Sequence, residues 1–249
     1  MKCLYDKELL TDVQEISASS CGSLIGYFYI LFNGDMDKVT QVAVETSLKS
    51  AAKPDLKTFI NKFGFIDASK IEKIIIKTAG CDPTFKELYE MNPIKLHIPT
   101  FDLMSNRTIY MSVDTTPDMK VSRAIRKSIS VPVVFTPCRE DGHLYLDGST
   151  IESNPFAPFL GKTDVFELRW KRKLYEKQIP KSVFEYVKLL ILSLFDLTNR
   201  MSEYTSFDKI ELYSDHDDQS YNFASITDDM KMKIFHEGYS QMLSRLKYI

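Results

Sequence analysis

The sequence has few cysteines and no excess of either charge. Its four cysteines, Cys3, Cys21, Cys81 and Cys138, are far apart, and no Cys-x-x-Cys pair or histidine cluster accompanies them. This spacing disfavours a disulfide framework and a zinc site, and it is typical of reduced thiols in an intracellular protein. The formal net charge of −2 at pH 7 gives none of the basic excess that nucleic-acid binding requires. We therefore expect a globular intracellular protein without a nucleic-acid partner.

The sequence also lacks a long, uncharged apolar run. Its most apolar segment, residues 183–197, carries three charged side chains and is shorter than the roughly 20 apolar residues of a membrane span. Acidic residues, Asp6 and Glu8, stand near the start, where a secretory signal peptide needs an apolar core. The prediction is a cytoplasmic or peripherally membrane-associated chain with no signal peptide and no transmembrane helix. We expect residues 183–197 to form a buried helix, with a lipid-facing lid as the alternative.

Small residues gather at positions 16–26, where a short strand is predicted to turn into an apolar helix. The segment reads Ile-Ser-Ala-Ser-Ser-Cys-Gly-Ser-Leu-Ile-Gly. A sharp strand-to-helix turn exposes its apical side chain and has little room for side chains two positions away, which gives the Gly-x-Ser-x-Gly pattern of a nucleophile elbow. Here the pattern is Ala18-x-Ser20-x-Gly22, and alanine adds only one methyl group. The alternative is a serine-rich cap on a buried helix.

The start of the predicted helix would place backbone N–H groups beside Ser20. The first N–H groups of a helix have no partner within the helix, and they lie at its positive end. Such groups can stabilise the negative oxygen that develops during acyl transfer. Cys21 is the best donor by this argument, and Gly22 is the next.

A second motif lies near the middle of the chain. Asp141-Gly142 is typical of a tight turn between two strands, and the second strand leads to Asp147-Gly148-Ser149. A carboxylate at this strand end can be held against another loop. Together with the serine turn, the motif resembles the patatin-like phospholipase family, whose hydrolases use a Ser/Asp dyad with the aspartate in an Asp-Gly-Gly or Asp-Gly-Ala motif. The resemblance implies that Ser20 is the nucleophile and Asp147 its partner, with no metal or other cofactor.

The resemblance extends over most of the chain, with two departures. Ser149 stands where the family prefers glycine or alanine, and none of the 19 residues before Ser20 is a glycine, whereas family members carry a glycine-rich oxyanion loop there. The implied fold is a three-layer α/β/α sandwich with a mostly parallel central sheet. We expect residues 1–249 to form one patatin-like domain that is short at its N-terminus. Further segments in the family's order are residues 84–88, 116–118, 124–132 and 238–239.

The resemblance implies a lipid acyl hydrolase of the phospholipase A, lysophospholipase or acylglycerol esterase type. Ser20 would form an acyl-enzyme that water then cleaves, on a lipid substrate presented at a membrane surface. An aspartate with an unperturbed pKa near 3.9 is a weak base at neutral pH, so burial would have to raise the pKa of Asp147. The alternative is a catalytically impaired descendant that binds lipid or protein. The oligomeric state stays open.

The four histidines are poor candidates for a third catalytic member. His97 precedes Asp147, whereas α/β-hydrolases run serine, acid, histidine; we expect it to be a hydrogen-bonded structural residue in a strand. His216 lies in an acidic segment that is typical of a solvated turn, and His236 lies in a helical run. We therefore expect none of these, nor His143, to contact Ser20 or Asp147.

Hydrophobic periodicity predicts the remaining elements. Asp35 and Thr227 are predicted to cap helices, and residues 56–79 are expected to be helical in two halves. Further predicted elements are antiparallel strands at 95–103 and 107–113, a helix at 120–130, and strands at 165–170 and 209–214.

Overall fold

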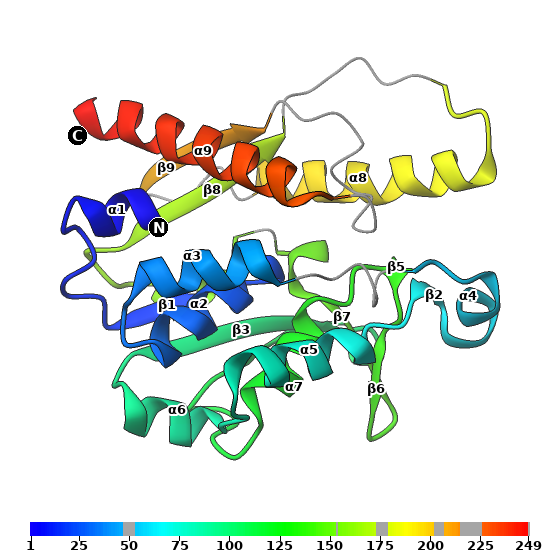
Figure 1. Cartoon of the computed structure of the whole chain (residues 1–249). Coiled ribbons are helices and arrows are strands. Elements are labelled where there is room, and N and C mark those ends of the chain that lie inside the picture. The colour runs from blue at the N-terminus through cyan, green and yellow to red at the C-terminus, as the bar shows by residue number, and fades with distance from the viewer. Residues whose placement is uncertain (47–52, 153, 173–178, 202–206, 215–225, 249) are drawn as a thin grey trace.

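The computed structural model describes residues 1–46, 53–152, 154–172, 179–201, 207–214 and 226–248, and Figure 1 shows their arrangement. The strands in chain order are β1 (Glu15–Ser17), β2 (Gly64–Ile66), β3 (Lys95–Asp102), β4 (Arg107–Met111), β5 (Val133–Phe135), β6 (Cys138–Glu140), β7 (His143–Asp147), β8 (Phe166–Arg172) and β9 (Asp208–Ser214). The α-helices are α1 (Lys2–Asp6), α2 (Cys21–Leu31), α3 (Met36–Glu45), α4 (Leu56–Lys62), α5 (Ser69–Ala79), α6 (Phe85–Met91), α7 (Val121–Ser128), α8 (Val183–Met201) and α9 (Asp228–Arg245). Short 3-10 helices are η1 (Gly148–Thr150), η2 (Ala157–Phe159) and η5 (Leu246–Tyr248).

A five-stranded sheet contains β3 as its longest member. β3 pairs in parallel with β1 and antiparallel with both β4 and β7, and β7 pairs antiparallel with β6. β6 and β7 are joined by a tight turn at Asp141 and Gly142, whose φ angles are 48° and 80°, and such a turn can connect only antiparallel strands because a parallel pair needs a long crossover. The predicted α/β class is confirmed. The central sheet, however, is mixed rather than mostly parallel.

The register of β3 brings the ends of β1 and β7 toward one another. β1 runs parallel to β3 and ends with Ser17 opposite His97. β7 runs antiparallel to β3 and ends with Asp147 opposite Thr100. The two strands therefore run in opposite directions along β3, and both end near its middle.

Helices α2 and α7 pack against β3. Gly26 lets α2 approach closely, because a Cβ atom there would lie 3.1 Å from Leu96 Cδ1 and 3.2 Å from Ile16 Cγ2. The following residues, 27–30, are all buried, as expected for a helix that is apolar on most sides. This close packing fixes the N-terminal end of α2, where Ser20 lies.

The predicted helix caps at Asp35 and Thr227 are confirmed. Asp35 Oδ1 accepts the N–H groups of Asp37 and Lys38 at 3.1 and 3.0 Å, at the start of α3. Thr227 Oγ1 accepts the N–H of Met230 at 3.2 Å, at the start of α9. Each cap satisfies N–H groups that have no partner within the helix.

The two helical halves predicted within residues 56–79 are α4 and α5, but the prediction missed β2, which lies between them. Phe63 ends α4 in the left-handed conformation, with a φ angle of 66°. Gly64 then lies against another backbone segment, so that a Cβ atom there would be 2.3 Å from the carbonyl carbon of Phe135. β2 pairs in parallel with β5, and this long-range pairing overrides a local pattern that fits a helix.

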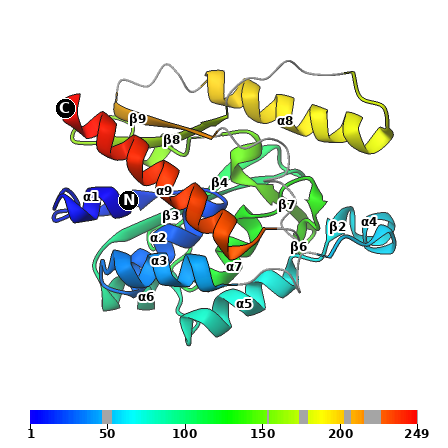
Figure 2. The ribbon, with the colours of Figure 1, turned by 45° about the horizontal axis from the view of Figure 1, so that its top comes forward.

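The C-terminal part of the chain adds a parallel pair, β8 and β9, together with α8 and α9. α9 packs against α1 and α3 and lies beside them in both ribbon views (Figure 1, Figure 2). A second hydrophobic cluster fills this region, formed by Cys3, Leu4, Ile210 and Met242. In Figure 1, α9 lies above β3, and α5, α6 and α7 lie below it.

The prediction that residues 183–197 form a buried helix is wrong, although α8 does span them. One face of α8 is exposed and apolar: Val183 is 80% exposed, and the other members are between 47% and 53% exposed. This α8 stripe comprises Val183, Tyr186, Leu190, Leu194 and Leu197. α8 also contacts η1, the turn that follows Asp147.

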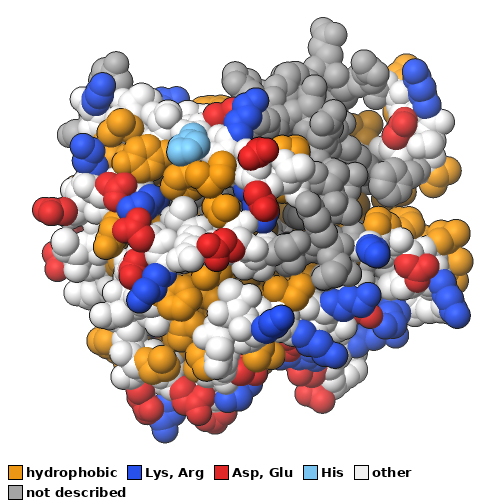
Figure 3. All heavy atoms as spheres, viewed as in Figure 1, with side chains coloured by type: hydrophobic (Ala, Val, Ile, Leu, Met, Phe, Trp, Pro, Cys, Tyr) orange, Lys and Arg blue, Asp and Glu red, His pale blue; other side chains and the backbone are white. Residues whose placement is uncertain are grey.

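No helix among the described residues combines the length and the apolar character needed to cross a membrane. Acidic and basic side chains are interspersed over the face shown in Figure 3. This mixture agrees with the small formal net charge of −2.

Candidate active site

Ser20 stands at the apex of the turn between β1 and α2, in a strained backbone conformation. Its φ and ψ angles are 51° and −127°, a region that non-glycine residues occupy at a cost of roughly 1–3 kcal/mol. The N–H of Ser20 donates to Ser128 Oγ at 3.1 Å. Its carbonyl oxygen accepts from the Ser23 hydroxyl at 2.5 Å and from the Ser23 N–H at 3.0 Å. The surrounding residues thus hold both backbone groups of the apical serine.

Ala18 and Gly22 face each other across this turn. A Cβ atom built on Gly22 would lie 3.4 Å from the Ala18 Cβ, so the two positions already approach van der Waals contact. Larger side chains at both positions would collide. The small-residue pattern therefore follows from the geometry of the turn, with alanine tolerated at one side because glycine occupies the other.

Asp147 is fully buried at the end of β7. Its Oδ1 accepts the N–H of Ser149 at 2.9 Å and the Ser149 hydroxyl at 2.5 Å. Its Oδ2 is buried and has no hydrogen-bond partner among the described residues. Gly148 is required because a Cβ atom there would lie 2.5 Å from the carbonyl oxygen of Pro99. Ser149 thus holds the carboxyl group through Oδ1, while Oδ2 is available to accept a proton or a hydrogen bond.

Burial raises the pKa of Asp147 from 3.8 to about 6, although the Ser149 side chain, the nearby Ser20 side chain and the Ser149 N–H oppose the rise. The Ser20 hydroxyl is therefore close enough to act on this carboxyl group. No hydrogen bond of standard geometry joins the two in this structure. Catalytic hydrogen bonds without substrate are often long and tighten only when substrate binds. The pKa falls in the range that a general base needs near neutral pH.

The two predicted oxyanion donors differ in availability. The N–H of Gly22 donates to the Ser19 carbonyl oxygen at 2.9 Å. The N–H of Cys21 makes no hydrogen bond to another residue in the part of the chain that the structure describes. Desolvation, and then the Asp147 carboxylate, raise the pKa of the Cys21 thiol. This thiol is consequently protonated near neutral pH and is a poor nucleophile.

The histidines that the structure describes are engaged away from both residues. His97 Nε2 lies 3.0 Å from Glu15 Oε2, which confirms its predicted structural role in a strand. His143 Nδ1 lies 2.7 Å from Asp102 Oδ2, and His236 belongs to α9. None of these three hydrogen-bonds to Ser20 or Asp147, whereas His216 lies outside the described residues.

Sequence reasoning missed the part played by the end of α7. The sequence marked residues 124–132 as a family landmark and residues 120–130 as a helix, but it gave no role in the site to Ser128, which contacts the backbone of Ser20. The Ser130 carbonyl oxygen accepts the N–H of Asp147 at 3.0 Å. The one available signal was the presence of two serines at the end of an otherwise amphipathic helix.

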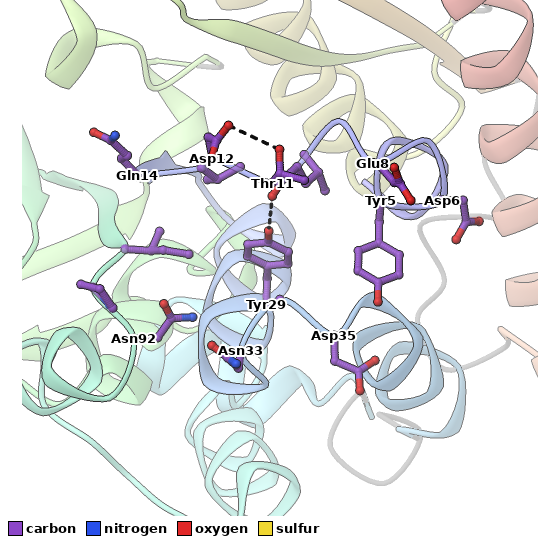
Figure 4. Close-up of a pocket in the computed structure, with 15 residues that line it drawn as sticks. Tyr5, Asp6, Glu8, Thr11, Asp12, Gln14, Tyr29, Asn33, Asp35 and Asn92 are labelled. Carbon is purple, nitrogen blue, oxygen red and sulfur yellow. Dashed lines mark hydrogen bonds between the residues drawn. The ribbon is translucent and has the colours of Figure 1, made fainter.

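A wide surface hollow of about 860 Å³ lies at the opposite end of β1, next to the residues that precede the strand. Figure 4 shows four carboxylates around it, from Asp6, Glu8, Asp12 and Asp35, and neither lysine nor arginine lines it. It contains neither Ser20 nor Asp147. Among the described residues, no group of three or more His, Cys, Asp or Glu side chains is placed to hold a metal ion.

A comparison with known families matches residues 1–160 to the model described as "Patatin-like phospholipase". This span is more than half of the chain and includes Ser20, Ser128 and Asp147. The chain belongs to the patatin-like phospholipase family. The resemblance noted from the sequence is thereby confirmed.

Two viral relatives of this patatin-like chain match it over 156 residues each. An uncharacterised protein of Acanthamoeba polyphaga mimivirus is 31% identical, and the match covers 59% of this chain and 51% of that protein. A protein of Invertebrate iridescent virus 6, named a probable lipid hydrolase, is 21% identical, with coverages of 62% and 49%. The aligned part is thus about half the length of these curated relatives.

The crystal structure of VipD from Legionella pneumophila has the same fold. The match covers 99% of this chain and 63% of that one, with a TM-score of 0.63 and 12% sequence identity. At this level of identity, the comparison establishes the fold alone. It confirms the patatin-like α/β architecture.

Proposed function

We propose that the chain is a lipid acyl hydrolase in which Ser20 is the nucleophile and Asp147 the general base. The observation that carries this proposal is the juxtaposition of a serine at a strained turn with a fully buried carboxyl group. One oxygen of that carboxyl group has no hydrogen-bond partner among the described residues. An unsatisfied buried acceptor is costly, and a proton donor in the reaction would satisfy it. Membership of a phospholipase family favours a lipid ester as the substrate.

The proposed reaction has two halves. Asp147 takes the proton of the Ser20 hydroxyl as the serine oxygen attacks the ester carbonyl carbon, which gives a tetrahedral oxyanion. Collapse of this intermediate breaks the bond to the alcohol oxygen, and the alcohol leaves with the proton from Asp147. Water then attacks the acyl-enzyme with Asp147 again as base, which releases the carboxylic acid and regenerates Ser20.

Stabilisation of the oxyanion falls first to the N–H of Cys21, because that of Gly22 donates to Ser19. Removing one such donor from a hydrolase typically costs about 100- to 1,000-fold in rate. We therefore expect slow turnover when Cys21 is the sole donor. A catalytically impaired lipid-binding or protein-binding role is the second candidate, and the occupied N–H of Gly22 is the observation that favours it.

We further propose that the substrate is a phospholipid or acylglycerol presented at a membrane surface. The α8 stripe supports this, since its apolar side chains are exposed on a helix that contacts the turn after Asp147. Exposed apolar side chains on a helix are typical of surfaces that enter the boundary between lipid headgroups and acyl chains.

The test compares wild type, Ser20→Ala and Ser19→Ala on a short-chain nitrophenyl ester and on phospholipid vesicles. Wild type and Ser19→Ala should hydrolyse the ester, and Ser20→Ala should not. The matched control removes a neighbouring hydroxyl without touching the proposed nucleophile. Hydrolysis by wild type no faster than by Ser20→Ala would contradict the enzymatic proposal. Retained vesicle binding in that case would favour the lipid-binding role.

A further inference from the structure

The C-terminal end of α7 contacts the backbone of both proposed dyad members. Ser128 and Ser130 are both 0% exposed. Ser128 Oγ accepts the N–H of Ser20 at 3.1 Å, and the Ser130 carbonyl oxygen accepts the N–H of Asp147 at 3.0 Å. Ser20 and Asp147, which lie far apart in the sequence, thus both hydrogen-bond to one short segment, residues 128–130.

This segment is itself held firmly. Arg126, only 4% exposed, donates to Ser130 Oγ at 2.6 Å and to the Thr136 carbonyl oxygen at 2.8 Å. The Ser130 hydroxyl donates back to the Arg126 carbonyl oxygen at 3.0 Å. Lys127 forms an ion pair with Glu140. Because these bonds join α7 to the strands that follow it, the end of the helix is a fixed support for what it contacts.

Among the described residues, the Ser128 hydroxyl hydrogen-bonds to one partner, the N–H of Ser20. Ser20 has a φ angle of 51°, which is a strained conformation. Without the hydrogen bonds that hold its backbone groups, Ser20 would relax to a less strained φ angle. Rotation of the peptide before Ser20 would turn the serine hydroxyl away from Asp147. A displacement of about 1 Å at a reacting atom can cost about 100-fold in rate.

We propose that Ser128 is a positioning residue for the hydrolytic reaction, which it serves by holding the strained backbone of Ser20 so that the hydroxyl faces Asp147. This role rests on the proposed function. Ser128 does not touch the substrate and exchanges no proton with it.

The experiment measures two rates on the full chain, the labelling of Ser20 by a fluorophosphonate probe and the hydrolysis of a nitrophenyl ester. The variants are Ser128→Ala and Ser128→Cys, because cysteine fills similar space but offers only a weak acceptor. Ser122→Ala is the matched control: Ser122 is also buried on α7 and has no hydrogen bond to Ser20 or Asp147. Circular dichroism and thermal unfolding identify which variants are folded.

Both Ser128 variants should label and turn over roughly 10- to 100-fold more slowly, with KM changed less than about twofold. The midpoint of the acid limb of their pH–rate profiles should rise above that of wild type, because the Ser20 hydroxyl, which lowers the pKa of Asp147, turns away from the carboxyl group. Ser122→Ala should behave as wild type. If Ser128→Ala does not fold, the labelling and hydrolysis rates of Ser128→Cys are compared with those of wild type instead.

A folded Ser128 variant with the wild-type rate would overturn the positioning role and leave the proposed function intact. An equal loss in Ser122→Ala would overturn it too, by showing that any change in α7 has this effect. A wild-type protein that neither labels nor hydrolyses the ester would overturn the proposed function, and with it the role of Ser128.

Discussion

Ser20 occupies a backbone conformation that glycine adopts without the clash of a Cβ atom. With a φ angle of 51°, the serine retains strain that its hydrogen bonds to Ser23 and Ser128 balance. In a hydrolase, this strain is the cost of presenting the hydroxyl at the apex of a sharp turn. The backbone strain and the proposed chemical role of Ser20 can therefore be separated by substitution.

The first prediction concerns that strain. Ser20→Gly and Ser20→Ala should both be inactive, but Ser20→Gly should be more stable by roughly 1 kcal/mol, because glycine tolerates positive φ and alanine does not. Urea unfolding of the two variants gives the difference. Equal stabilities, or a more stable alanine variant, would show that the turn carries no such strain.

The second prediction concerns Asp147, whose folded-state pKa of about 6 lies above its ordinary value of 3.8. Burial favours the protonated form of Asp147, so ionisation of this group lowers the free energy of unfolding. This loss develops as the pH rises from 3.8 to about 6 and is complete above that pH. At 1.36 kcal/mol per pKa unit, the cost is on the order of 3 kcal/mol. Asp147→Asn should thus lose activity, yet gain stability over wild type at pH 8.

Thermal unfolding of Asp147→Asn and wild type at several pH values checks this sign. The gain should be largest at pH 8 and should shrink between pH 6 and pH 4, where wild type becomes protonated in both its folded and unfolded states. A stability difference that does not vary with pH would contradict the assignment of a buried, raised-pKa carboxyl group. Ser122→Ala, at a buried residue of α7 that has no hydrogen bond to Asp147, serves as the control that keeps the carboxyl group and its partners.

Among the elements, those defined by local chemistry were predictable. The turn at Ser20, the hairpin at Asp141-Gly142 and the cap at Asp35 follow from residue types a few positions apart, and the structure contains each of them. β2 was not predictable in this way, since its pairing with β5 joins segments far apart in the sequence. The contact of Ser128 with Ser20 was missed for the same reason.

The mixed character of the central sheet was partly predictable from the sequence. The short connections between β3 and β4 and between β6 and β7 already imply antiparallel pairs, and the expectation of a mostly parallel sheet came from the family resemblance instead. For the site, sequence patterns supplied Ser20 and Asp147 as candidates. The burial that raises the pKa of Asp147 depends on tertiary packing, so only the structure could supply it.

The third prediction belongs to α8. Replacing Leu190 and Leu194 together with aspartate should lower hydrolysis of vesicle phospholipid at least about tenfold, because two charges oppose entry into the lipid interface. Hydrolysis of a soluble short-chain ester should stay within about twofold of wild type. Ile60→Asp, at a residue of α4 that is 65% exposed, is the matched control. Equal losses on both substrates would show that the α8 stripe serves the fold rather than the lipid surface.

At the scale of the whole molecule, β3 organises the proposed site. It directs β1 and β7 toward each other, and α7, which packs on it, supports both ends. The proposed nucleophile, base and positioning residue therefore come from three separate segments that meet only in the folded chain. All three lie within residues 1–160, the span that matches the patatin-like phospholipase model.

The most direct test of this account is the pH dependence of Ser20 labelling by a fluorophosphonate probe, in wild type and in Asp147→Asn, with the adduct mapped by mass spectrometry. Wild type should label at Ser20 alone, with a rate that falls as the pH drops through about 6, the pKa of Asp147. Asp147→Asn should label slowly and without this midpoint, since it has no base to ionise. An adduct on another residue, or an Asp147→Asn rate equal to that of wild type, would contradict the Ser20/Asp147 dyad.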